Sequence, residues 1–577
     1  MTNGEIADAL AELGALYELD GAVRYRVIAY QEAARVIRDS PVSVEELARE
    51  GRATELPGVG KTLQEKIVAL VDDGSIPSAD KLKQRFPASL IEVTYVPGVG
   101  ARTARRLYDE LGIESLEQLR AAAEKGELRD VKGLGPKAEE NVLAAVERID
   151  ADGVAERRLL SDVLAIAEEL ASALRDSPAC GEVAVAGSAR RMTETCKDVD
   201  LIATTTDTAA LAKVLAEHPL TADVGAGGDA GARIVTHNGI KVDVRIAAPD
   251  EYGNLLQHFT GSAEHNVKLR ERAVGRGLSI SEHGIKDTDT GKVETCATEA
   301  EVYGRVDLPY IEPELREGGA EIKAAVAGEL PELVTRDHIR GDLHCHTTLS
   351  DGHNTLEEMV EAARKLKYSY LAITDHSASH GFGNEVSPEA LEARIEEVRA
   401  LDKRTKGIKV LAGTEANILP DGSLDYGDDL LAKLDWVLAS VHTSFRISKK
   451  KMTDRVVAAI EHPYVDCIGH LTGRMILKRP PYEIDVERVA GAAAENGTML
   501  EINGNPNRRD VSENNARLAV EHGATIVVNT DAHRVRTMDN MRYGIATARR
   551  AWLTADQVAN TRTWRSFSPL RKRSKRR

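Results

Sequence analysis

The sequence predicts a multidomain protein that joins a helical amino-terminal region to a mixed α/β region and a carboxyl-terminal parallel β/α barrel. At 577 residues the chain is too long for one hydrophobic core, because a single core stops growing at about 250–300 residues. The first 150 residues carry apolar side chains at helical spacing, without β-branched runs. From about residue 340 onward, short apolar runs alternate with helical stretches, which is the pattern of a parallel sheet.

Composition and cysteine usage agree with an ordinary globular protein. Hydrophobic residues make up 42% of the chain and charged residues 29%. The five cysteines are scattered and odd in number, which favours a reducing compartment over a disulfide framework. The amino terminus lacks the basic segment and apolar core of a signal peptide, and no apolar run of about 18 residues follows. We therefore expect a cytoplasmic protein with no membrane partner.

The formal net charge of −16 would argue against a nucleic-acid partner if charge acted only globally. Charge acts locally, however, so a basic groove can lie on an acidic protein. The last seven residues, 571–577, read RKRSKRR and form either a solvated end or a tail that grips DNA.

Residues 1–150 contain three copies of one short pattern, in which two glycines flank an apolar residue and an amphipathic helix follows. The copies are LPGVGKTLQEKI (56–67), VPGVGARTARRLY (96–108) and VKGLGPKAEENV (131–142). The glycines allow a tight turn between two helices, and the free N–H groups of the second helix can bind a phosphate. The pattern resembles the helix-hairpin-helix motif, which binds the DNA backbone without reading its sequence. By this resemblance the DNA-binding positions are Gly58, Gly60, Gly98, Gly100, Gly133 and Gly135.

Between about residues 155 and 310, short apolar strands alternate with helices, and three aspartates lie on the predicted strands. Asp198 and Asp200 are two residues apart in DVDLIAT, so a strand would place both carboxylates on one face. Asp243 lies in IKVDVRIA, which we expect to form a neighbouring strand. An Asp-x-Asp pair alone is common on surface strands, but three convergent carboxylates suit two Mg²⁺ ions that activate a 3′-hydroxyl and hold a triphosphate.

This constellation resembles the nucleotidyltransferase fold, and more closely the palm of the family X DNA polymerases. The resemblance makes Asp198, Asp200 and Asp243 the catalytic, metal-binding residues of a polymerase site that uses Mg²⁺ or Mn²⁺. One departure is Lys197, which precedes the first aspartate where the family has glycine and would crowd or neutralise the site. The resemblance also assigns the incoming nucleotide to residues in AGSARR and HFTGSAEHNVKLR, namely Gly187, Ser188, Arg191, His258, Phe259, Gly261, Asn266 and Arg270.

The amino-terminal stretch YRVIAYQEAARVI (25–37) resembles the small 5′-phosphate-binding domain of the same family. Some members use a lysine of this domain as a Schiff-base nucleophile to remove deoxyribose phosphate. Lys66 and Tyr30 match that lysine and a neighbouring residue. Because Arg26 and Thr62 replace lysines of the lyase-active pattern, we expect phosphate binding and leave lyase activity open.

Seven stretches from about residue 340 combine a strand pattern with a following helix and predict a parallel barrel. The strands end in DLHCHT, YLAITDHS, KVLAGTE, DWVLASVHT, DCIGHL, TMLEINGN and ATIVVNTDAH. In parallel barrels the chemistry gathers at the carboxyl ends of the strands. Eleven of the sixteen histidines fall between His338 and His533, which indicates metal chemistry confined to this region.

His344, Cys345 and His346 present two alternatives at first sight, a zinc clip and a thiol nucleophile with two bases. On a strand the histidines share one face and Cys345 points the other way, so we expect the cysteine to pack in the core. A metal takes four to six ligands, and the other strand ends can supply them. The candidate set has nine nitrogen and oxygen ligands: His344, His346, Asp351, His376, Glu415, His442, His470, Asp531 and His533.

The nine positions resemble the polymerase and histidinol phosphatase (PHP) domain, a seven-unit barrel that hydrolyses phosphoesters. The resemblance implies two or three Mn²⁺ or Zn²⁺ ions and a metal-bound hydroxide that attacks phosphorus. Asp375 is expected either behind the ligands or as a strand-end cap, and Arg474 either as a phosphate clamp or as a surface residue. His353, His380 and His462 are expected to be bystanders.

The resemblances cover nearly the whole chain in the order of the bacterial and archaeal family X DNA polymerases with a PHP domain. The expected fold is a helical helix-hairpin-helix region, an α/β nucleotidyltransferase palm and a distorted (β/α)7 barrel. The expected domains are a lyase-like 5′-phosphate-binding domain (1–85), a fingers-like hairpin domain (86–150), the palm (151–250), a thumb-like nucleotide-selection domain (251–315), a linker (316–337), the PHP barrel (338–570) and the basic tail (571–577).

The resemblance implies a gap-filling polymerase of base excision repair whose barrel is a metal-dependent 3′→5′ exonuclease. Its expected partners are dNTPs and gapped or nicked duplex DNA with a 5′-phosphate, bound by a monomer. One alternative is a DNA 3′-end nuclease, phosphatase or AP endonuclease with a weak or inactive palm, which Lys197 favours. Another is a non-catalytic DNA scaffold that uses only the hairpins.

Overall fold

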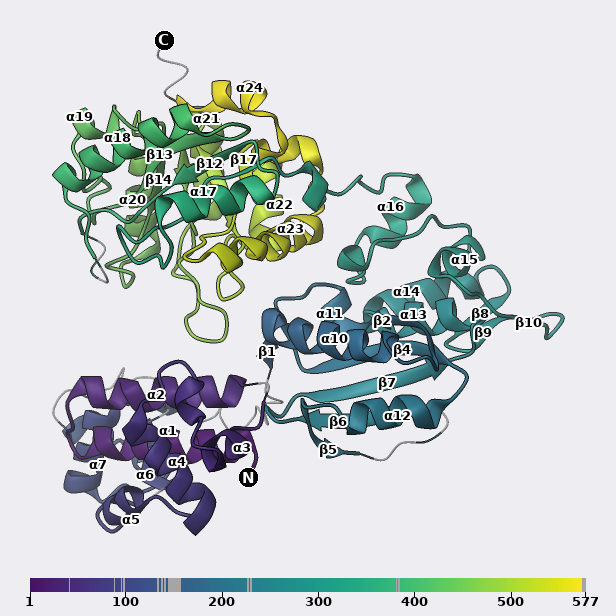
Figure 1. Ribbon diagram of the computed structural model, residues 1–577, viewed down its shortest axis with the longest axis horizontal. Helices are drawn as coiled ribbons and strands as arrows, with labels where there is room; N and C mark the ends of the chain where they lie inside the picture. Colours follow the sequence, from purple (N-terminus) through teal and green to yellow (C-terminus); the bar gives the residue numbers. More distant parts are fainter. Residues whose placement is uncertain are drawn as a thin grey trace. The chain divides into compact units, whose positions relative to one another are not determined.

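The structure is a computed structural model with two compact units (Figure 1). The first unit comprises Met1–Arg158, Asp162–Ala186 and Cys196–Tyr252. The second comprises Leu159–Ser161, Gly187–Thr195 and Gly253–Arg577. The structure describes residues 1–572 except 41, 88, 95, 97–98, 132–133, 136–138, 140–141, 144–156, 226–227, 229–230, 380 and 382–383.

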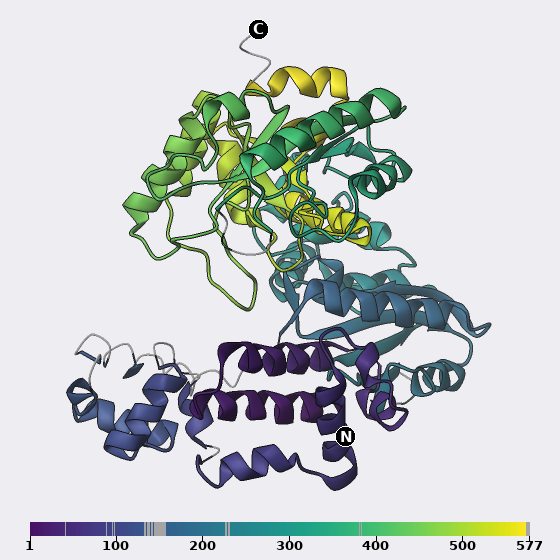
Figure 2. The same ribbon diagram turned by 60° about the vertical axis from the view of Figure 1, so that its left-hand side comes forward.

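The amino-terminal region is helical, as predicted, and its helices share one apolar core that includes Leu10, Ile37 and Leu90. Helix α1 begins with a capping box, in which Thr2 Oγ1 accepts from Glu5 N and the Glu5 carboxylate accepts from Thr2 N. Helices α1 and α2 pack side by side (Figures 1 and 2). The elements are α1 (Asn3–Leu19), α2 (Arg24–Asp39), α3 (Val44–Arg49), η1 (Ala53–Glu55), α4 (Lys61–Asp73), α5 (Pro77–Lys83), α6 (Ser89–Thr94), α7 (Ala101–Leu111), α8 (Leu116–Glu124) and η2 (Leu128–Asp130).

The turns of the predicted hairpins are described in part. Gly60 and Gly100 are the N-cap residues of α4 and α7, and no described side chain caps either helix. Gly58 has a φ of 79°, a left-handed backbone that favours glycine. The other two first-position glycines, Gly98 and Gly133, lie outside the described residues, and Gly135 follows the buried Leu134.

The first unit also contains a mixed five-stranded sheet with the strand order β2-β4-β7-β6-β5. Strands β4 and β7 pair in parallel, and the other neighbours pair antiparallel. Helix α12 packs against β5 and β6. This sheet agrees with the predicted α/β region. The elements of this stretch of the chain, of which α11 belongs to the second unit, are β1 (Arg158–Leu159), α10 (Leu160–Arg175), β2 (Cys180–Val185), α11 (Gly187–Arg190), β3 (Thr195–Cys196), β4 (Asp198–Thr205), α12 (Thr208–Ala216), β5 (Thr221–Val224), β6 (Gly231–Thr236) and β7 (Lys241–Ala247).

The next part of the second unit packs two helices and a three-stranded antiparallel sheet around a core that includes Leu269, Val302 and Ile311. The Glu299 carboxylate at the start of α15 is buried and binds two guanidinium groups, those of Arg190 and Arg316. The elements are α13 (Tyr252–Thr260), α14 (Ala263–Val274), β8 (Leu278–Ser281), β9 (Gly284–Asp287), β10 (Val293–Glu294), α15 (Glu299–Gly304), η3 (Pro313–Leu315) and α16 (Glu321–Ala327).

The segment 316–337, which we predicted to be a linker, is folded over its first part. Arg316 is fully buried, and its Nη1 lies 2.6 Å from the Glu299 carboxylate. Glu321 is 1% exposed, lies 2.8 Å from His265 Nδ1 and accepts from Gly318 N. The prolines and charges of the segment are typical of a solvated connector, but here its charges are paired inside the fold, which is how charged groups become buried.

The carboxyl-terminal part of the second unit is a seven-stranded parallel sheet in sequential order from β11 to β17, as predicted. A parallel bridge between Cys345 and Ala532 joins the extensions of its first and last strands, so the sheet is nearly closed. The strands are β11 (Gly341–Asp342), β12 (Tyr370–Ile373), β13 (Lys409–Asn417), β14 (Trp436–Ser440), β15 (Cys467–Ile468), β16 (Met499–Asn503) and β17 (Thr525–Asn529).

Helices cover the outside of the barrel, and aromatic side chains fill its amino-terminal end. Tyr370 and Phe567 stack at 4.9 Å, with Trp436 beside them. This plug leaves the carboxyl end of the barrel for chemistry. The helices are η4 (Arg336–His338), α17 (Leu356–Lys365), α18 (Pro388–Arg404), α19 (Asp428–Leu431), α20 (Lys449–Glu461), α21 (Val486–Asn496), α22 (Glu513–Glu521), η5 (Val535–Asn540), α23 (Met541–Arg550), η6 (Ala555–Gln557), η7 (Ala559–Thr561), α24 (Trp564–Phe567) and η8 (Ser568–Leu570).

The predicted basic tail begins inside the barrel domain. Arg571 Nη1 donates to the Asp435 carbonyl, and Lys572 Nζ donates to the carbonyls of Ile460 and His462. Residues 573–577, which carry the rest of the predicted tail, lie outside the described residues. Among the described residues, no helix is long and apolar enough to cross a bilayer.

Replacement of Glu321 by alanine should loosen α16. The change leaves His265 buried without its carboxylate partner, which costs about 1–3 kcal/mol. Amide hydrogen exchange of residues 318–328 should therefore accelerate by about 5- to 150-fold. Glu332→Ala, at an exposed position of the same segment, is the matched control and should change nothing. Unchanged exchange in the Glu321 variant would show that the segment is held by other contacts.

Candidate metal centres

The three predicted catalytic aspartates meet on two neighbouring strands of the mixed sheet. Asp200 and Asp243 are direct partners in the parallel register of β4 and β7, and Asp198 lies two residues earlier on β4. Alternate residues of a strand face the same side, so the three carboxylates share one face. All three are half-buried. Like charges on paired strands repel one another, and oxygen ligands suit Mg²⁺, so this donor set fits a divalent cation.

Two cationic side chains lie next to this carboxylate centre. Arg233 is the register partner of Asp243 on β6, and its Nε lies 2.5 Å from Asp243 Oδ1. Arg233 was not predicted as a site residue, because an arginine on a strand carries no motif of its own. Lys197 is exposed beside Asp198 at the start of β4. A cation that binds Asp243 therefore competes with a guanidinium that already holds it.

The predicted triphosphate-binding residues belong to the second unit. Gly187 and Ser188 begin α11, and Gly187 has a φ of 63°. Arg191 Nη1 donates to the Thr260 carbonyl at 2.6 Å, and Arg191 Nε lies 3.2 Å from the Glu317 carboxylate. These bonds hold the Arg191 side chain within its own unit, and its contact with a nucleotide stays a prediction.

The second predicted nucleotide motif lies where α13 meets α14. The rings of His258 and Phe259 contact each other edge-on at 5.1 Å. Gly261 follows with a φ of 67°. Asn266 is buried, and its Nδ2 donates to the His258 carbonyl at 2.7 Å, whereas Arg270 is exposed on α14. The structure brings the motif together, and the roles of these residues toward a base or template stay predictions.

The two candidate lyase residues have different surroundings. Lys66 lies on α4, where its Nζ donates to Ser78 Oγ at 2.8 Å. Tyr30 is 6% exposed and packs against Tyr17 at 5.3 Å. Burial, with Tyr17 nearby, raises the pKa of Tyr30 to about 12, so its phenol stays protonated at neutral pH. Tyr30 is therefore placed as a core residue, and Lys66 as a hydrogen-bonded helix residue.

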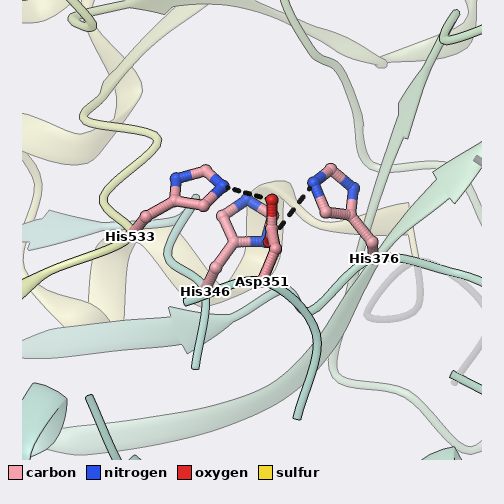
Figure 3. Close-up of side chains that lie close together, drawn as sticks. All are labelled: His346, Asp351, His376 and His533. Carbon is pink, nitrogen blue, oxygen red and sulfur yellow. Dashed lines mark ion pairs between the residues drawn. The ribbon is translucent and has the colours of Figure 1, made fainter. Parts of the chain in front are cut away.

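The predicted ligands of the barrel converge at the carboxyl ends of its strands. Figure 3 shows four of them, in which Asp351 lies between His533, at 3.2 Å from its Nε2, and His376, at 3.7 Å from its Nε2. Ligand atoms within 4.8 Å of one another form three overlapping groups: His346, Asp351, His376 and His533; His344, His346 and Asp531; and His376, Glu415 and His442.

Glu415 connects these groups and brings in the ninth ligand. Its carboxylate is fully buried at the end of β13. One oxygen lies 2.8 Å from His470 Nε2 and 3.2 Å from His442 Nε2. The other lies 2.9 Å from His376 Nδ1 and 3.3 Å from His344 Nε2. Because its two oxygens serve different imidazoles, Glu415 can bridge two cations.

Buried polar atoms test whether this cluster fits a metal. Both ring nitrogens of His346 and the Nδ1 of His470 are buried, and among the described residues they have no partner with hydrogen-bond geometry. Such atoms are rare and costly in folded proteins. His470 and Asp531 also adopt left-handed φ angles of 28° and 54°, a strain that clusters at functional sites. Nitrogen and oxygen donors in this number fit Zn²⁺ or Mn²⁺.

Burial and neighbouring charges move the pKa values of the clustered imidazoles in different directions. Burial, with neighbouring imidazoles, lowers the pKa of His346 to about 3. Burial likewise lowers the pKa of His442 to about 4 against the opposing effect of Glu415. Burial alone would lower the pKa of His533 too, but the ion pair with Asp351 raises it to about 9. Nearby carboxylates also raise the pKa of His344 and His376 against the opposing effect of burial. Neutral imidazole is the form that binds a metal, so His346 and His442 are ready at neutral pH, and a bound ion would release the protons of the others.

Cys345 is not part of the cluster, as predicted. Its side chain is fully buried in the core that surrounds the barrel. The Sγ lies 3.9 Å from Thr530 Oγ1, and burial holds the pKa of the thiol well above its usual value. A protonated, inaccessible thiol is a poor nucleophile and a poor ligand.

Glu501 is a site residue that sequence reasoning missed. It is fully buried in the middle of β16, and its Oε1 lies 2.7 Å from His344 Nδ1. Asn529 donates to the same oxygen at 2.9 Å. A carboxylate on the far nitrogen of a ligating histidine fixes the ring and its tautomer. The available signal was its place in TMLEINGN, one of the predicted strand ends.

Asp375 and Arg474, the two residues considered as assistants of the metal ligands, lie in different surroundings. Asp375 is buried and accepts from Thr347 N and Ser350 Oγ, so it supports the loop behind the ligands. Arg474 is neither a free phosphate clamp nor a free surface residue, because its guanidinium binds both oxygens of Glu194, at 3.2 and 2.5 Å.

The expected bystander histidines are not among the ligand groups that the described residues form, although His353 N donates to the His533 carbonyl at 2.8 Å. His353 Nε2 lies 3.0 Å from Nη2 of the Arg534 guanidinium, and His462 Nε2 lies 3.2 Å from Asp428 Oδ1. His380 is outside the described residues.

Comparison with known proteins gives matches along most of the chain. A full-length relative is the DNA polymerase/3′-5′ exonuclease PolX of Bacillus subtilis (strain 168), 35% identical over 576 residues and 100% of both chains. A probable phosphatase of Thermoanaerobacter sp. (strain X514) is 34% identical over 239 residues, 38% of this chain and 89% of its own. The matching family models are a helix-hairpin-helix domain (1–76), a SAM-like helix-hairpin-helix tandem (90–148), a DNA polymerase beta thumb (255–317) and a PHP domain (342–505).

These matches and the two centres define a DNA-binding protein in which a polymerase-type thumb and carboxylate centre share a chain with a PHP barrel. The full-length relative extends this definition to the whole sequence. The chain belongs to the bacterial family X DNA polymerases that carry a carboxyl-terminal PHP domain.

Glu501→Gln should weaken metal binding in the barrel without removing a ligand. The amide cannot match the charge of the carboxylate that orients His344, so metal affinity should fall by about 10- to 100-fold. Titration of the metal-free protein with Mn²⁺ measures the change directly. Glu483→Gln, on the exposed surface of the same domain, is the matched control. Equal affinities in the two variants would remove Glu501 from the site.

Proposed function

We propose that this protein fills gaps in DNA during base excision repair and removes nucleotides from DNA 3′ ends, with one metal centre for each reaction. The observation that supports this best is the presence of two separate donor sets in one chain, three carboxylates on β4 and β7 and nine ligands at the barrel ends. The full-length relative is named a DNA polymerase and 3′-5′ exonuclease, and the thumb and hairpin matches supply the DNA-binding parts.

In the synthetic reaction, the carboxylates of Asp198, Asp200 and Asp243 hold Mg²⁺, with Mn²⁺ as the substitute. The bound ions would act as Lewis acids on the 3′-hydroxyl and the triphosphate. Gly187 and Ser188 offer backbone and hydroxyl contacts to the phosphates, and Arg191 exchanges its Glu317 partner for the triphosphate. The nucleotide motif at α13 and α14 lies against the sugar and base.

In the hydrolytic reaction, the nine barrel ligands hold a cluster of two or three Mn²⁺ or Zn²⁺ ions. The cluster would supply an activated water and would steady the phosphoryl oxygens. Glu415 and Asp531 keep the cluster together through their shared imidazole neighbours. Glu501 keeps His344 in the orientation that points its Nε2 at the cluster.

The proposed partners follow from the DNA-binding parts. The substrate is gapped or nicked duplex DNA, with its 5′-phosphate bound near Lys66 and the backbone bound at the hairpin turns that Gly58, Gly60 and Gly100 form. The protein acts as a monomer with dNTPs. A cytoplasmic location is supported by the five cysteines, all of which are free.

A second candidate function is 3′-end hydrolysis with a weak palm. It is favoured by Lys197 beside Asp198 and by Arg233 on Asp243, since both cations oppose metal binding. The relatives that match only the PHP half are named probable phosphatases. This function extends to AP endonuclease or phosphatase activity of the barrel.

Primer extension separates the two candidates. On a gapped, 5′-phosphorylated duplex with Mg²⁺ or Mn²⁺, wild type should extend the primer with dNTPs and shorten it without them. Asp243→Ala should lose extension by at least about 10³-fold, because a metal is worth several kcal/mol, and should keep degradation.

His344→Ala should show the opposite pattern and lose degradation while it keeps extension. The two variants serve as each other's control. A wild type that degrades 3′ ends but extends nothing would leave only the second candidate. Degradation that survives in His344→Ala would place hydrolysis outside the barrel.

Lys197→Gly should raise the efficiency of synthesis. The exposed ammonium beside Asp198 repels a cation by an amount typical of surface charges, so kcat/KM for dNTP should rise about two- to fivefold. Lys213→Ala removes an equally exposed lysine from α12 and is the control. An equal or lower kcat/KM in Lys197→Gly would show that the lysine does not limit the palm.

A further inference from the structure

The side-chain amide of Asn266 is held by two partners of opposite hydrogen-bonding character. Its Oδ1 accepts from Gln257 Nε2 at 2.9 Å, and its Nδ2 donates to the His258 carbonyl at 2.7 Å. Gln257 is 2% exposed and Asn266 is 9% exposed. Gln257 and His258 lie near the end of α13, and Asn266 lies on the next helix, α14 (Figure 1). The predicted nucleotide motif includes His258 and Asn266 but begins after Gln257.

These two partners fix which way round the amide lies. Turning the Asn266 amide over would exchange its oxygen and its nitrogen. The nitrogen would then meet the donor of Gln257, and the oxygen would meet the carbonyl of His258. Both hydrogen bonds would be lost, and each buried group would face one of its own kind, which is costly inside a fold. The amide therefore keeps the observed orientation as long as both partners are present.

The same bonds also set the direction of the group that Asn266 has left to offer. A primary amide carries two N–H donors, and the His258 carbonyl takes one of them. No other described residue accepts from the second. The two bonds engage different atoms of one rigid plane, so together they fix that plane and the direction of the second N–H. With the His258 bond alone, the amide could turn about that bond.

A donor with a fixed direction suits the edge that every correct base pair presents in the minor groove. Adenine N3 and thymine O2 are acceptors there, and a G·C pair keeps acceptors in the equivalent places while it adds the amino group of guanine. One N–H can thus bond to any correctly paired nucleotide without regard to its identity. A carbonyl in the same place would meet an acceptor and repel it.

We propose that Gln257 is a positioning residue of the nucleotide site, which holds the Asn266 amide with its second N–H toward the minor-groove acceptor of the incoming base. Because Gln257 is buried and bonds to Asn266, it acts through Asn266 and does not itself touch the nucleotide. This role rests on the proposed synthetic function and on the predicted place of Asn266 at the base edge.

The junction between α13 and α14 has supports other than the bond between Gln257 and Asn266. Ser262 Oγ caps α14 by accepting from His265 N, and Ser262 N donates to the Arg316 carbonyl. The buried ring of His265 lies 2.8 Å from the Glu321 carboxylate. Loss of the Gln257 amide should therefore leave the two helices in place and release only the Asn266 side chain.

The test compares dATP with 3-deaza-2′-deoxyadenosine triphosphate, in which a C–H group replaces the N3 acceptor. Both nucleotides pair with a template thymine through the same edge. In single-nucleotide insertion on gapped DNA with Mg²⁺, the full-length wild type should use dATP about 5- to 150-fold better in kcat/KM, the range for one donor left without its acceptor. In Gln257→Met, which is close in size but has no donor, kcat/KM for dATP should fall and the ratio should approach unity.

A double-variant cycle shows whether Gln257 acts through Asn266. Asn266→Ala should also bring the ratio close to unity, and adding Gln257→Met to it should cost nothing further, because residues that act through one contact are not additive. Gln257→Leu is a second variant of similar size and should give the same ratio as Gln257→Met.

Thr260→Val is the matched control for a disturbed helix. Thr260 is fully buried on α13, and its Oγ1 accepts from Arg190 Nη1 at 2.6 Å. Valine keeps the shape of the side chain and removes that hydrogen bond without removing either partner of Asn266. The ratio between the two nucleotides should stay at the wild-type value in this variant, whatever its absolute rate.

The outcomes separate the positioning role from the proposed function. A wild-type ratio in both Gln257 variants overturns the positioning role and leaves the proposed function standing. Equal losses for the two nucleotides, additive with Asn266→Ala, assign Gln257 to the stability of α13 instead. A wild type that inserts both nucleotides equally well removes Asn266 from the base edge, and the positioning role with it. A wild type that inserts neither overturns the proposed synthetic function.

Discussion

The buried carboxylate of Glu415 is the constraint around which the barrel is organised. It lies within 3.6 Å of five imidazoles, those of His344, His346, His376, His442 and His470. These residues come from strands that are far apart in the sequence, and only near-closure of the sheet brings their ends together. A fully buried charge is tolerated only when it is paired, so the barrel and the cluster depend on each other.

The barrel also holds the segment Gly187–Thr195, whose first residues are proposed to bind the triphosphate. Arg474 binds the Glu194 carboxylate, Arg509 donates to the Met192 carbonyl, and Arg550 donates to the Arg191 carbonyl. Arg474 and Arg509 lie in loops that follow barrel strands, Arg550 ends helix α23, and Arg509 is itself fully buried. The segment is therefore held by the hydrolytic domain, although its neighbours in the sequence belong to the first unit.

The features of the fold and of the two centres that could be predicted from the sequence are those that depend on residue periodicity and on strand ends. Seven strand endings sufficed to select the nine barrel ligands, because a parallel barrel gathers such ends at one place. Asp243 was expected on a strand next to that of Asp198 and Asp200, and β4 and β7 are indeed paired, with Asp200 opposite Asp243. Glu501 and Arg233 were missed, since a residue that acts on another side chain has no spacing rule of its own. The predicted linker, 316–337, is folded over its first part. In the sequence, its charged residues look like those of an exposed connector, although in the structure Arg316 pairs with Glu299 inside the fold.

DNA binding likewise depends on the local charge of a surface and not on the net charge of the protein. A protein with a net charge of −16 repels a polyanion at long range, and salt screens that repulsion beyond about 10 Å. Within this distance only nearby charges matter. Residues 443–451, with four basic and no acidic side chains, and the helix N-termini at Gly60 and Gly100, which no described side chain caps, each present local positive potential. An acidic average charge is therefore compatible with local surfaces that attract DNA.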